Sequence, residues 1–402
     1  MKVLQINSVY GIGSTGRIAK DLNDLLIEKG HESYVAYGRE SITEDDNIIR
    51  IGSKLDNYFH VAATRLLDRH GFASKKATKE FIKKIDTIKP DIIHLHNIHG
   101  YYINIRILFD YLKENNQKVI WTLHDCWPFT GHCAYFDYVG CNKWKTICKK
   151  CPQKRNYPAS FLVDNSKKNY MDKRKIFNGL NDNLTIVTPS NWLSNLVNKS
   201  FLKNYKTNVI NNGIDLNKFQ PMNSNFKNEN NIQKKIMILG VASKWEKRKG
   251  FEYFIELANR IDDNKVIVLV GLTKSQKRSL PNNIIGIERT NNIKELVEIY
   301  TSADVFINPT LEDNFPTTNL EALACGTPVI TFNTGGSVES VNKNVGRIVE
   351  QGDIYSIIKI INNLDGNGLK LNSKSCIEFA NHNFDKNDRY ADYIKIYKEL
   401  LY

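Results

Sequence analysis

The chain has 402 residues, 41% of them hydrophobic and 25% charged, and a formal net charge of +13 at pH 7. A chain of this length accommodates two or three domains, and its apolar content argues against intrinsic disorder. No apolar run reaches the roughly 18 residues of a membrane-spanning helix, and the start, MKVLQIN, lacks the cleavage site of a signal peptide, so we expect a cytoplasmic protein.

In the first half of the chain, short apolar segments alternate with segments of helical period. Strands are predicted at 2–8, 31–37, 91–95, 118–123, 184–188 and 207–210. Helices are predicted at 18–29, 81–88, 105–114 and 191–200, the last with Ser190 as its N-cap.

The alternation restarts after a polar stretch at 222–233, which is typical of a linker. Strands are predicted at 235–241, 265–270, 284–287, 305–308 and 328–332, and helices at 251–261, 293–301, 317–325 and 355–364. This pattern predicts an α/β fold of two doubly wound, Rossmann-like domains facing a cleft, with ligands at the carboxyl ends of the strands. We expect domains at 1–215 and 216–384, and a C-terminal helix at 385–402 that packs back on the first domain.

A glycine-rich turn after the first strand contains Gly11, Gly13 and Gly16 and ends at Arg17. Backbone N–H groups between a strand and a helix can bind a phosphate there. A nicotinamide cofactor is poorly supported, because the second strand ends in YGR at 37–39 where an acidic residue is expected.

Three histidines surround the strand at 91–95, namely His94, His96 and His99. They could bind zinc. We favour an acceptor-lining loop, because strand alternation places residues 94 and 96 on one side while 99 lies in a loop. Tyr101 and Tyr102 would add aromatic surface for a sugar ring.

The strand at 118–123 places His124 at its carboxyl end, the edge where active sites form in open α/β sheets. Asp125 could orient His124 or cap the next segment. The insertion that follows, 126–151, is therefore expected to fold over the cleft and shape acceptor binding.

Five of the seven cysteines lie within this insertion. Clustered cysteines in odd number are typical of reduced thiols or metal ligands rather than of a disulfide framework. Four of them have spacings that could close a structural zinc site, the alternative being unligated thiols: Cys133, Cys141, Cys148 and Cys151.

The stretch 143–175 is strongly basic, with eleven Lys or Arg residues and two acidic ones. Such a surface could contact nucleic acid, an anionic membrane or a phosphorylated ligand, or it could simply be solvated.

The segment 305–328 combines a strand, a loop and a helix beginning near Pro316. A helix N-terminus is suited to a phosphate, which here would lie near Thr317 and Thr318. Glu321 shares a helix face with Thr317, so its carboxylate could accept hydrogen bonds from a ribose diol.

The run LEDNFPTTNLEALACGTP at 311–328 resembles the carboxylate-x7-carboxylate motif of family-4 glycosyltransferases, which have the GT-B fold and retain anomeric configuration. Further similar segments are TPS at 188–190, NGID at 212–215, GVASKWEKRKG at 240–250 and the glycine pair at 335–336. The resemblance thus covers nearly the whole chain.

For the donor side, the resemblance implies that Asp313, or Glu312 beside it, meets the donor sugar together with the backbone at Asn314 and Phe315. It also implies that Glu321 binds the ribose.

Lys249 stands at the position of the family's phosphate-binding lysine. Ser243 stands where the family usually has an arginine, so that Lys244 or Arg248 would supply the charge, or the site works with less of it.

For the other domain, the resemblance implies that His124 orients the donor sugar. The turn with Gly13 and Gly16 would belong to the acceptor side and the donor phosphate, with Arg17 a candidate for an acceptor phosphate and His99 beside it.

The resulting hypothesis is a retaining, hexosyltransferase-type enzyme that moves a sugar from a UDP- or GDP-sugar to a glycan acceptor, expected to be lipid-linked, in cell-surface polysaccharide or lipopolysaccharide biosynthesis. Because the chain has no Asp-x-Asp triplet, we expect catalysis to need no metal or other cofactor. We expect peripheral contact with the anionic inner face of the cell membrane, and no nucleic acid as partner. The alternatives are a basic zinc-knuckle protein that binds nucleic acid, and another GT-B enzyme such as a nucleotide-sugar epimerase or a phosphorylase.

Overall fold

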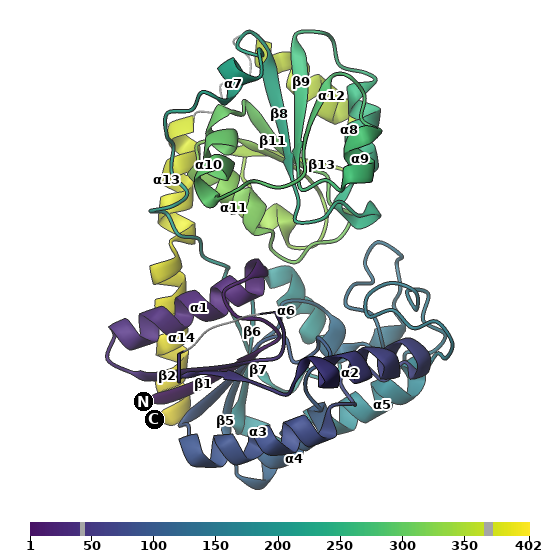
Figure 1. The fold of residues 1–402 in the computed structure, drawn as a ribbon, viewed down its shortest axis with the longest axis vertical. Coiled ribbons are helices and arrows are strands. Elements are labelled where there is room, and N and C mark those ends of the chain that lie inside the picture. The colour runs from purple at the N-terminus through teal and green to yellow at the C-terminus, as the bar shows by residue number, and fades with distance from the viewer. Residues whose placement is uncertain (41–44, 366–372) are drawn as a thin grey trace. The chain divides into compact units, whose positions relative to one another are not determined.

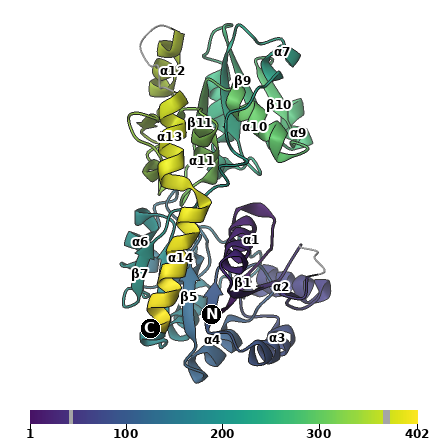
Figure 2. The same cartoon turned by 90° about the vertical axis from the view of Figure 1, so that its left-hand side faces the viewer.

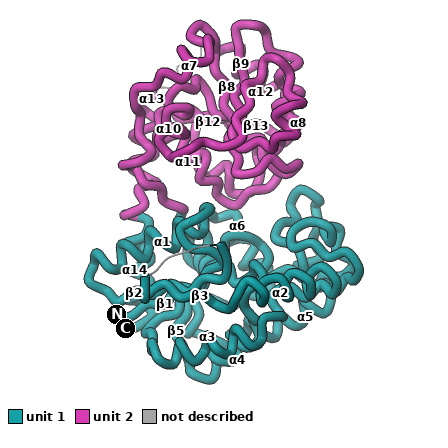
Figure 3. Tube along the Cα trace, viewed as in Figure 1, with its two compact units in different colours: residues 1–211, 389–402 teal, residues 212–388 magenta. Residues whose placement is uncertain are grey.

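The computed structural model describes residues 1–40, 45–365 and 373–402, which form two compact units. Unit 1 contains Met1–Asn211 and Arg389–Tyr402, and unit 2 contains Asn212–Asp388 (Figure 3). Each unit is built on one parallel sheet with helices packed on both faces (Figure 1). The predicted α/β fold of two Rossmann-like domains is confirmed.

The sheet of unit 1 has seven strands in the order β3-β2-β1-β4-β5-β6-β7. These are β1 (Lys2–Asn7), β2 (Glu32–Tyr37), β3 (Ile48–Arg50), β4 (Ile92–Leu95), β5 (Lys118–Thr122), β6 (Leu184–Thr188) and β7 (Lys206–Val209). The helices are α1 (Gly13–Glu28), α2 (Lys54–Leu67), α3 (Lys75–Ile88), α4 (Ile105–Glu114), α5 (Ser166–Phe177) and α6 (Asn191–Val197), with the later part of α14 (Lys386–Leu401).

Alternating strand residues build two cores in unit 1, because successive side chains of a strand point to opposite faces. Leu4 and Ile6 pack with α3 and α4 in one core, and Val3 packs with α1 and α14 in the other. Figure 2 shows α14 as a long helix that ends in unit 1. Its Tyr397 hydroxyl lies 2.7 Å from His94 Nδ1 of β4, so the end of the chain is held to the sheet by a buried polar contact.

The sheet of unit 2 has six strands in the order β10-β9-β8-β11-β12-β13. These are β8 (Ile236–Val241), β9 (Lys265–Val270), β10 (Ile284–Ile287), β11 (Val305–Asn308), β12 (Val329–Phe332) and β13 (Gly346–Val349). The helices are α7 (Phe226–Glu229), α8 (Phe251–Ala258), α9 (Lys274–Arg278), α10 (Ile293–Ser302), α11 (Thr317–Ala324), α12 (Ile354–Asn362) and α13 (Ser373–Phe384).

Each sheet has a point where the strand order reverses, between β1 and β4 in unit 1 and between β8 and β11 in unit 2. Loops leaving the two central strands diverge to opposite faces at such a switch point, which opens a ligand site at the carboxyl edge. Most of the expected functional residues follow these four strands, and His124 follows β5.

Several elements differ from the sequence-based expectations. Helix α1 begins at Gly13, five residues before the predicted start, so the glycine-rich turn is partly the first turn of the helix. Elements β3, α2, α5, α9, β13 and α13 were not predicted. The polar stretch 222–233, expected as a linker, lies inside unit 2 and contains α7, while the two units meet in the chain between Asn211 and Asn212.

Candidate functional site

Two loops of unit 2 meet at its switch point, 242–250 after β8 and 309–316 after β11. The N–H of Leu311 donates to the carbonyl of Arg248 (2.8 Å), and the Arg248 guanidinium donates to the carbonyl of Glu312 (2.9 Å). Arg248 therefore holds the backbone of the neighbouring loop. Lys244 was the other residue expected to supply the positive charge that Ser243 lacks. Its side chain is exposed and pairs with Glu246.

Two glycines permit close backbone contacts with the loop 309–316, Gly250 in the loop after β8 and Gly335 in the loop after β12. Gly250 has φ +77°, and a Cβ there would lie 2.1 Å from the carbonyl oxygen of Pro309. Gly335 has φ +51°, and a Cβ would lie 2.0 Å from the carbonyl oxygen of Asp313, which also accepts the N–H of Gly336 (3.1 Å). Side chains at either glycine would push the loops apart, since both the conformation and the space exclude a Cβ.

Lys249 and Asp313 form the central contact of the site. Lys249 Nζ lies 2.5 Å from Asp313 Oδ2, and the two side chains are only 22% and 12% exposed. The other carboxylate oxygen of Asp313 accepts the N–H of Asn314 (2.9 Å). Lys249 thus pairs with Asp313, and both Asp313 and the neighbouring Glu312 are buried. The pair presents a fixed ammonium a few residues before α11 begins.

Helix α11 starts beside this pair without a side-chain cap. Pro316 is its N-cap, not part of its first turn, and Thr317 and Thr318 are its first residues. The N–H groups of a first turn lack intrahelical partners and form the positive end of the helix dipole, so this position favours an anion.

Glu321 lies one turn into α11 and is nearly buried. Its Oε2 accepts a hydrogen bond from the hydroxyl of Tyr300 on α10 (3.0 Å). Asn319 anchors the same helix, accepting from Asn308 Nδ2 of β11 (2.8 Å) and donating to Ser340 Oγ (2.9 Å). Tyr300 and Asn319 were missed because isolated Tyr and Asn residues carry no sequence signal of their partners.

The remaining residues expected to bind the donor differ in their exposure to solvent. Ser243 is exposed in the loop after β8. Phe315 is buried, and its carbonyl accepts the side-chain amide of Asn212 (3.1 Å). Asn314 is buried beside it. The backbone of this short segment, rather than the Phe315 ring, is what the site can offer to a ligand.

In unit 1, His124 is half-buried at the carboxyl end of β5. Its Nε2 lies 3.2 Å from His96 Nδ1, and His96 Nε2 lies 3.1 Å from Gln5 Oε1 of β1. Burial lowers the pKa of His124 to about 4, opposed by Asp125 and assisted by His99. The imidazole is therefore neutral at pH 7, with one nitrogen able to donate a hydrogen bond and the other to accept one.

Asp125 contacts both His99 and the backbone of the segment that follows it. His99 Nε2 lies 3.0 Å from Asp125 Oδ2, and the N–H of Trp127 donates to Asp125 Oδ1 (2.9 Å). The pKa of Asp125 is lowered, because His99 and the Trp127 N–H outweigh the effect of burial. His99 Nδ1 lies 3.0 Å from the Tyr157 hydroxyl. Asp125 thus caps the next segment and orients His99.

The three histidines near β4 do not form one cluster. His94 is buried in β4 and His96 is buried just after it, whereas His99 lies further along the loop. Within residues 1–40, 45–365 and 373–402, no group of three or more His, Cys, Asp or Glu side chains is arranged to hold a metal ion. The expected aromatic surface is wrong, since Tyr101 and Tyr102 are both buried.

The glycine-rich segment lies at the carboxyl end of β1. The N–H of Gly11 donates to the carbonyl of Gly16 (2.9 Å), and Gly13 has φ +63°. Arg17 is exposed on α1, with its Nε 3.3 Å from the carbonyl of Gly13. Its guanidinium is accessible at the start of the helix.

Two families match the sequence over its two halves. Residues 15–218 match the family described as Glycosyltransferase Family 4, and residues 222–380 match Glycosyl transferases group 1. WcaC of Escherichia coli K12, named as a glycosyl transferase of colanic acid biosynthesis, is 25% identical over 379 residues, covering 90% of both chains. UDP-Gal:alpha-D-GlcNAc-diphosphoundecaprenol alpha-1,3-galactosyltransferase of Escherichia coli is 30% identical over 195 residues, 42% of this chain and 48% of that protein.

Solved structures share the fold over nearly the full length. Sucrose-phosphate synthase from Thermosynechococcus elongatus has a TM-score of 0.73 at 15% identity, covering 99% of this chain and 98% of that one. Anabaena Alr3699/HepE in complex with UDP has a TM-score of 0.68 at 14% identity, covering 99% and 100%.

Proposed function

We propose that this chain, which belongs to glycosyltransferase family 4 and has the GT-B fold, transfers a sugar with retention from a nucleotide-diphosphate sugar to a lipid-linked glycan in surface-polysaccharide biosynthesis. The family resemblance drawn from the sequence is confirmed by the family match. The observation that carries the proposal is the Lys249–Asp313 pair beside the start of α11, with Glu321 one turn further on.

A nucleoside diphosphate fits the chemistry of this group. Its phosphates would lie on the first N–H groups of α11 and the Lys249 ammonium, and its ribose hydroxyls on the Glu321 carboxylate that Tyr300 orients. UDP in the complex of the similar HepE structure, and UDP-Gal in the name of the galactosyltransferase relative, support a UDP-sugar over a GDP-sugar.

The transfer step breaks the bond between the anomeric carbon and the diphosphate oxygen and forms a bond to the acceptor hydroxyl on the same face. The acceptor proton passes to the leaving phosphate oxygen. Lys249 and the start of α11 offset the charge that develops on the diphosphate without a carboxylate-held metal. In unit 1, neutral His124 would accept a hydrogen bond from a sugar hydroxyl at Nδ1, because its single proton lies on Nε2 toward His96. In unit 2, Asp313 would also accept a hydrogen bond from a sugar hydroxyl.

The acceptor is proposed to be a glycan on a lipid diphosphate. The relative named for diphosphoundecaprenol supports this class. Exposed Arg17 at the start of α1 suits a phosphate of such an acceptor.

The transfer assay is the first test. Incubating the chain with UDP- and GDP-sugars is expected to release the nucleoside diphosphate only when an undecaprenyl-diphosphate-linked sugar is present, with the product extended by one sugar. Conversion of the donor to its epimer without acceptor would point to an epimerase. Salt-sensitive binding to nucleic acid with no turnover would favour the basic binding protein, which the family matches do not favour.

None of the helices in the described part of the chain is long and apolar enough to cross a membrane. Peripheral attachment to a membrane is proposed, on a surface formed by α2 and residues 161–163. Tyr58, Phe59 and Leu162 are 70%, 74% and 70% exposed, and the N–H of Phe161 donates to the carbonyl of Arg65 (2.8 Å), which joins the two segments. Apolar side chains beside exposed lysines, as at 167 and 168, suit an anionic lipid surface.

The double variant Phe59→Ser/Leu162→Ser is expected to reduce co-flotation with anionic vesicles at least about tenfold, because inserting one such side chain contributes about 1.5 kcal/mol or more. Tyr355→Ser, which alters an equally exposed aromatic residue of unit 2, is the control and should float as the unaltered chain does. Equal flotation of all three chains, or flotation that is the same without anionic lipid, would contradict this surface.

A further inference from the structure

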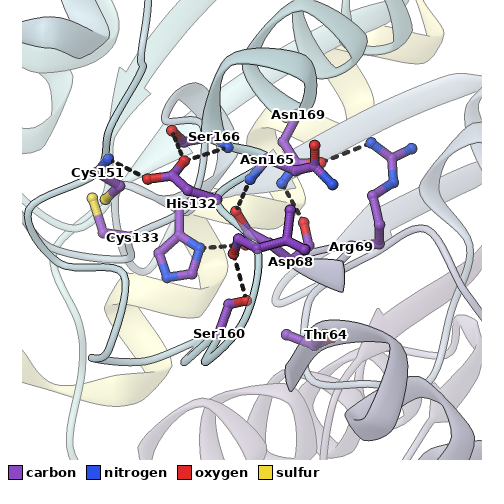
Figure 4. Close-up of polar contacts among 12 residues, drawn as sticks. Thr64, Asp68, Arg69, His132, Cys133, Cys151, Ser160, Asn165, Ser166 and Asn169 are labelled. Carbon is purple, nitrogen blue, oxygen red and sulfur yellow. Dashed lines mark hydrogen bonds and ion pairs between the residues drawn. The ribbon is translucent and has the colours of Figure 1, made fainter. Parts of the chain in front are cut away.

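The insertion between β5 and α5 brings four cysteines to one small cavity. Cys133, Cys141, Cys148 and Cys151 all line a cavity of ≈ 10 Å³, whose wall is completed by aromatic residues. Phe136 and Trp144 form that wall, stacked at 4.9 Å between ring centroids. Figure 4 shows the sulfurs of Cys133 and Cys151 side by side. Residues separated by up to 18 positions thus line one cavity of the insertion.

We propose that these four thiols bind one zinc ion as a tetrathiolate that closes the insertion. Four cysteines are a standard ligand set for a structural zinc site, and the final Cys148-x2-Cys151 pair has knuckle spacing. Soft thiolate ligands in tetrahedral number also select zinc over the hard cations Mg²⁺ and Ca²⁺.

The backbone around the cavity is already held in place. The Thr130 hydroxyl donates to the carbonyl of Cys133 (2.6 Å), the N–H of Cys141 donates to the carbonyl of Phe136 (3.2 Å), and the N–H of Cys151 donates to Asp164 Oδ2 (2.7 Å). The ligand-bearing segments are therefore fixed before any metal contact forms.

Backbone N–H groups also reach two of the sulfurs. The N–H of Gly131 hydrogen-bonds to the sulfur of Cys148, and that of Gln153 to the sulfur of Cys151. A Cβ at Gly131 would lie 2.1 Å from the carbonyl oxygen of Ser166, so only glycine fits there. Hydrogen bonds of this kind orient ligand sulfurs from outside the ligand set.

Zinc binding requires the thiols to turn toward the cavity. As they stand, no three metal-ligating side chains in the described ranges are arranged around one point. Protonated thiols gain nothing by converging, whereas zinc supplies the attraction and releases the thiol protons. A cysteine has one side-chain torsion, so this movement needs little change of the backbone.

The surrounding charge suits a centre with a net double negative charge. Lys173 is fully buried, its Nζ donates to the carbonyls of Trp127 (2.8 Å) and Thr130 (3.2 Å), and its strongest electrostatic partners are Cys148 and Cys133. Lys173 lies in the basic stretch 143–175, so that stretch is not wholly a solvated face. Asp125 and Asp68 also interact with Lys173, and thiolates on zinc would add to the negative charge around it.

His132, beside Cys133, ties the insertion to the rest of unit 1. Its Nδ1 lies 2.5 Å from Asp68 Oδ1, and both side chains are buried (Figure 4). Asp68 also accepts the N–H of Asn165 (2.8 Å), at the residue that precedes α5. A zinc ion at the four cysteines would therefore stiffen a segment already anchored at its edge.

Metal analysis of the purified full-length chain is the test. We expect about one zinc per chain, as for a closed structural site. Cys141→Ser and Cys148→Ser should each lower the zinc content several-fold. Cys126→Ser is the matched control, since Cys126 is buried in the same core but does not line the cavity, and it should keep zinc.

Because a variant could fail to fold, the unaltered chain provides a second measurement. Replacing zinc with cobalt should produce the intense visible bands of tetrahedral thiolate coordination, and a thiol-blocking reagent should release the metal stoichiometrically. The proposal is overturned by a zinc-poor chain whose four thiols all react freely in the native state. A Cys133–Cys151 disulfide in the purified chain, or equal zinc loss in Cys126→Ser, would overturn it as well. None of these measurements depends on glycosyl transfer.

Discussion

Replacing Lys249 with methionine is expected to lower kcat/KM for the donor by about a hundred- to a thousandfold, the usual cost of removing one group that stabilises developing charge. Negative charge grows on the diphosphate as its bond to the sugar breaks, and the Lys249 ammonium is held for this by Asp313 at 2.5 Å. Methionine keeps much of the side-chain length and removes the charge. Initial rates over a range of donor concentrations measure the effect.

The division between kcat and KM separates two roles of Lys249. If the ammonium acts on the departing diphosphate, kcat should fall more than KM rises. Lys249→Arg keeps the positive charge and should recover part of the rate. Lys274→Met alters an exposed lysine of α9 in the same unit and should be neutral. A Lys249→Met enzyme with unchanged kcat and only a raised KM would show that Lys249 contributes to binding alone.

Unit 1 is expected to lose stability when the pH falls below about 6.5, the ordinary pKa of histidine. Burial lowers the pKa of both His60 and His94 to about 3. The unfolded chain therefore binds these protons at a higher pH than the folded chain, and stability is lost as pH decreases from 6.5 toward 3. At pH 5 the loss is about 2 kcal/mol for each histidine, a large part of a typical domain's 5–15 kcal/mol.

The contacts of these two histidines explain why they stay neutral. His60 Nε2 accepts the N–H of Gly71 (3.0 Å) and its Nδ1 lies 2.8 Å from Ser74 Oγ. His94 lies between the hydroxyls of Thr122 (2.8 Å) and Tyr397 (2.7 Å). The ionisable groups facing them are further histidines and tyrosines, His70 and Tyr101 near one and His96, His124 and Tyr393 near the other. Hydroxyls and imidazoles offer no negative charge to stabilise an imidazolium.

Urea unfolding at pH 7.5 and pH 5, followed by tryptophan fluorescence, measures this loss. Four of the five tryptophans and eight of the nine histidines lie in unit 1, so the signal and the cause belong to the same unit. His94→Gln should reduce the difference between the two pH values by about 2 kcal/mol. His382→Gln in α13 of unit 2 is the control. Equal stability at both pH values would show that these histidines are protonated in the folded chain.

Most strands were predicted because their signal is local, whereas β3 and β13 were missed. Segments such as β5 and β9 are short, apolar and bounded by helical periods, and they are buried along almost their whole length. Helix α2 was missed because its exposed face carries the apolar residues Leu55, Tyr58 and Phe59. The sequence therefore lacks the polar face by which an amphipathic helix is identified. The start of α1 was missed because glycines at 11, 13 and 16 are typical of a loop, although Gly13 and Gly16 are helical here.

The site residues divide in the same way. Glu321 and Lys249 were proposed from spacing and family resemblance. These indicate which position in the chain carries a role, but not which other residue that side chain contacts. Tyr300 on Glu321, and the carbonyl contact that engages Arg248, depend on how separate elements pack. Tyr101 and Tyr102 were expected at a surface, but both are buried. Their burial depends on how the elements of unit 1 pack, which their neighbours in the sequence do not indicate.

By itself the sequence determined the α/β class, the two series of strands, the family and the residues that could serve a nucleotide sugar, because period, spacing and turn residues are read from neighbours in the chain. Only the tertiary structure decided which of them meet. Lys249 and Asp313 are 64 residues apart, and His94 and Tyr397 are 303 apart. The order of strands in each parallel sheet brings such pairs together, and that order is set by packing over the whole unit rather than by any local segment.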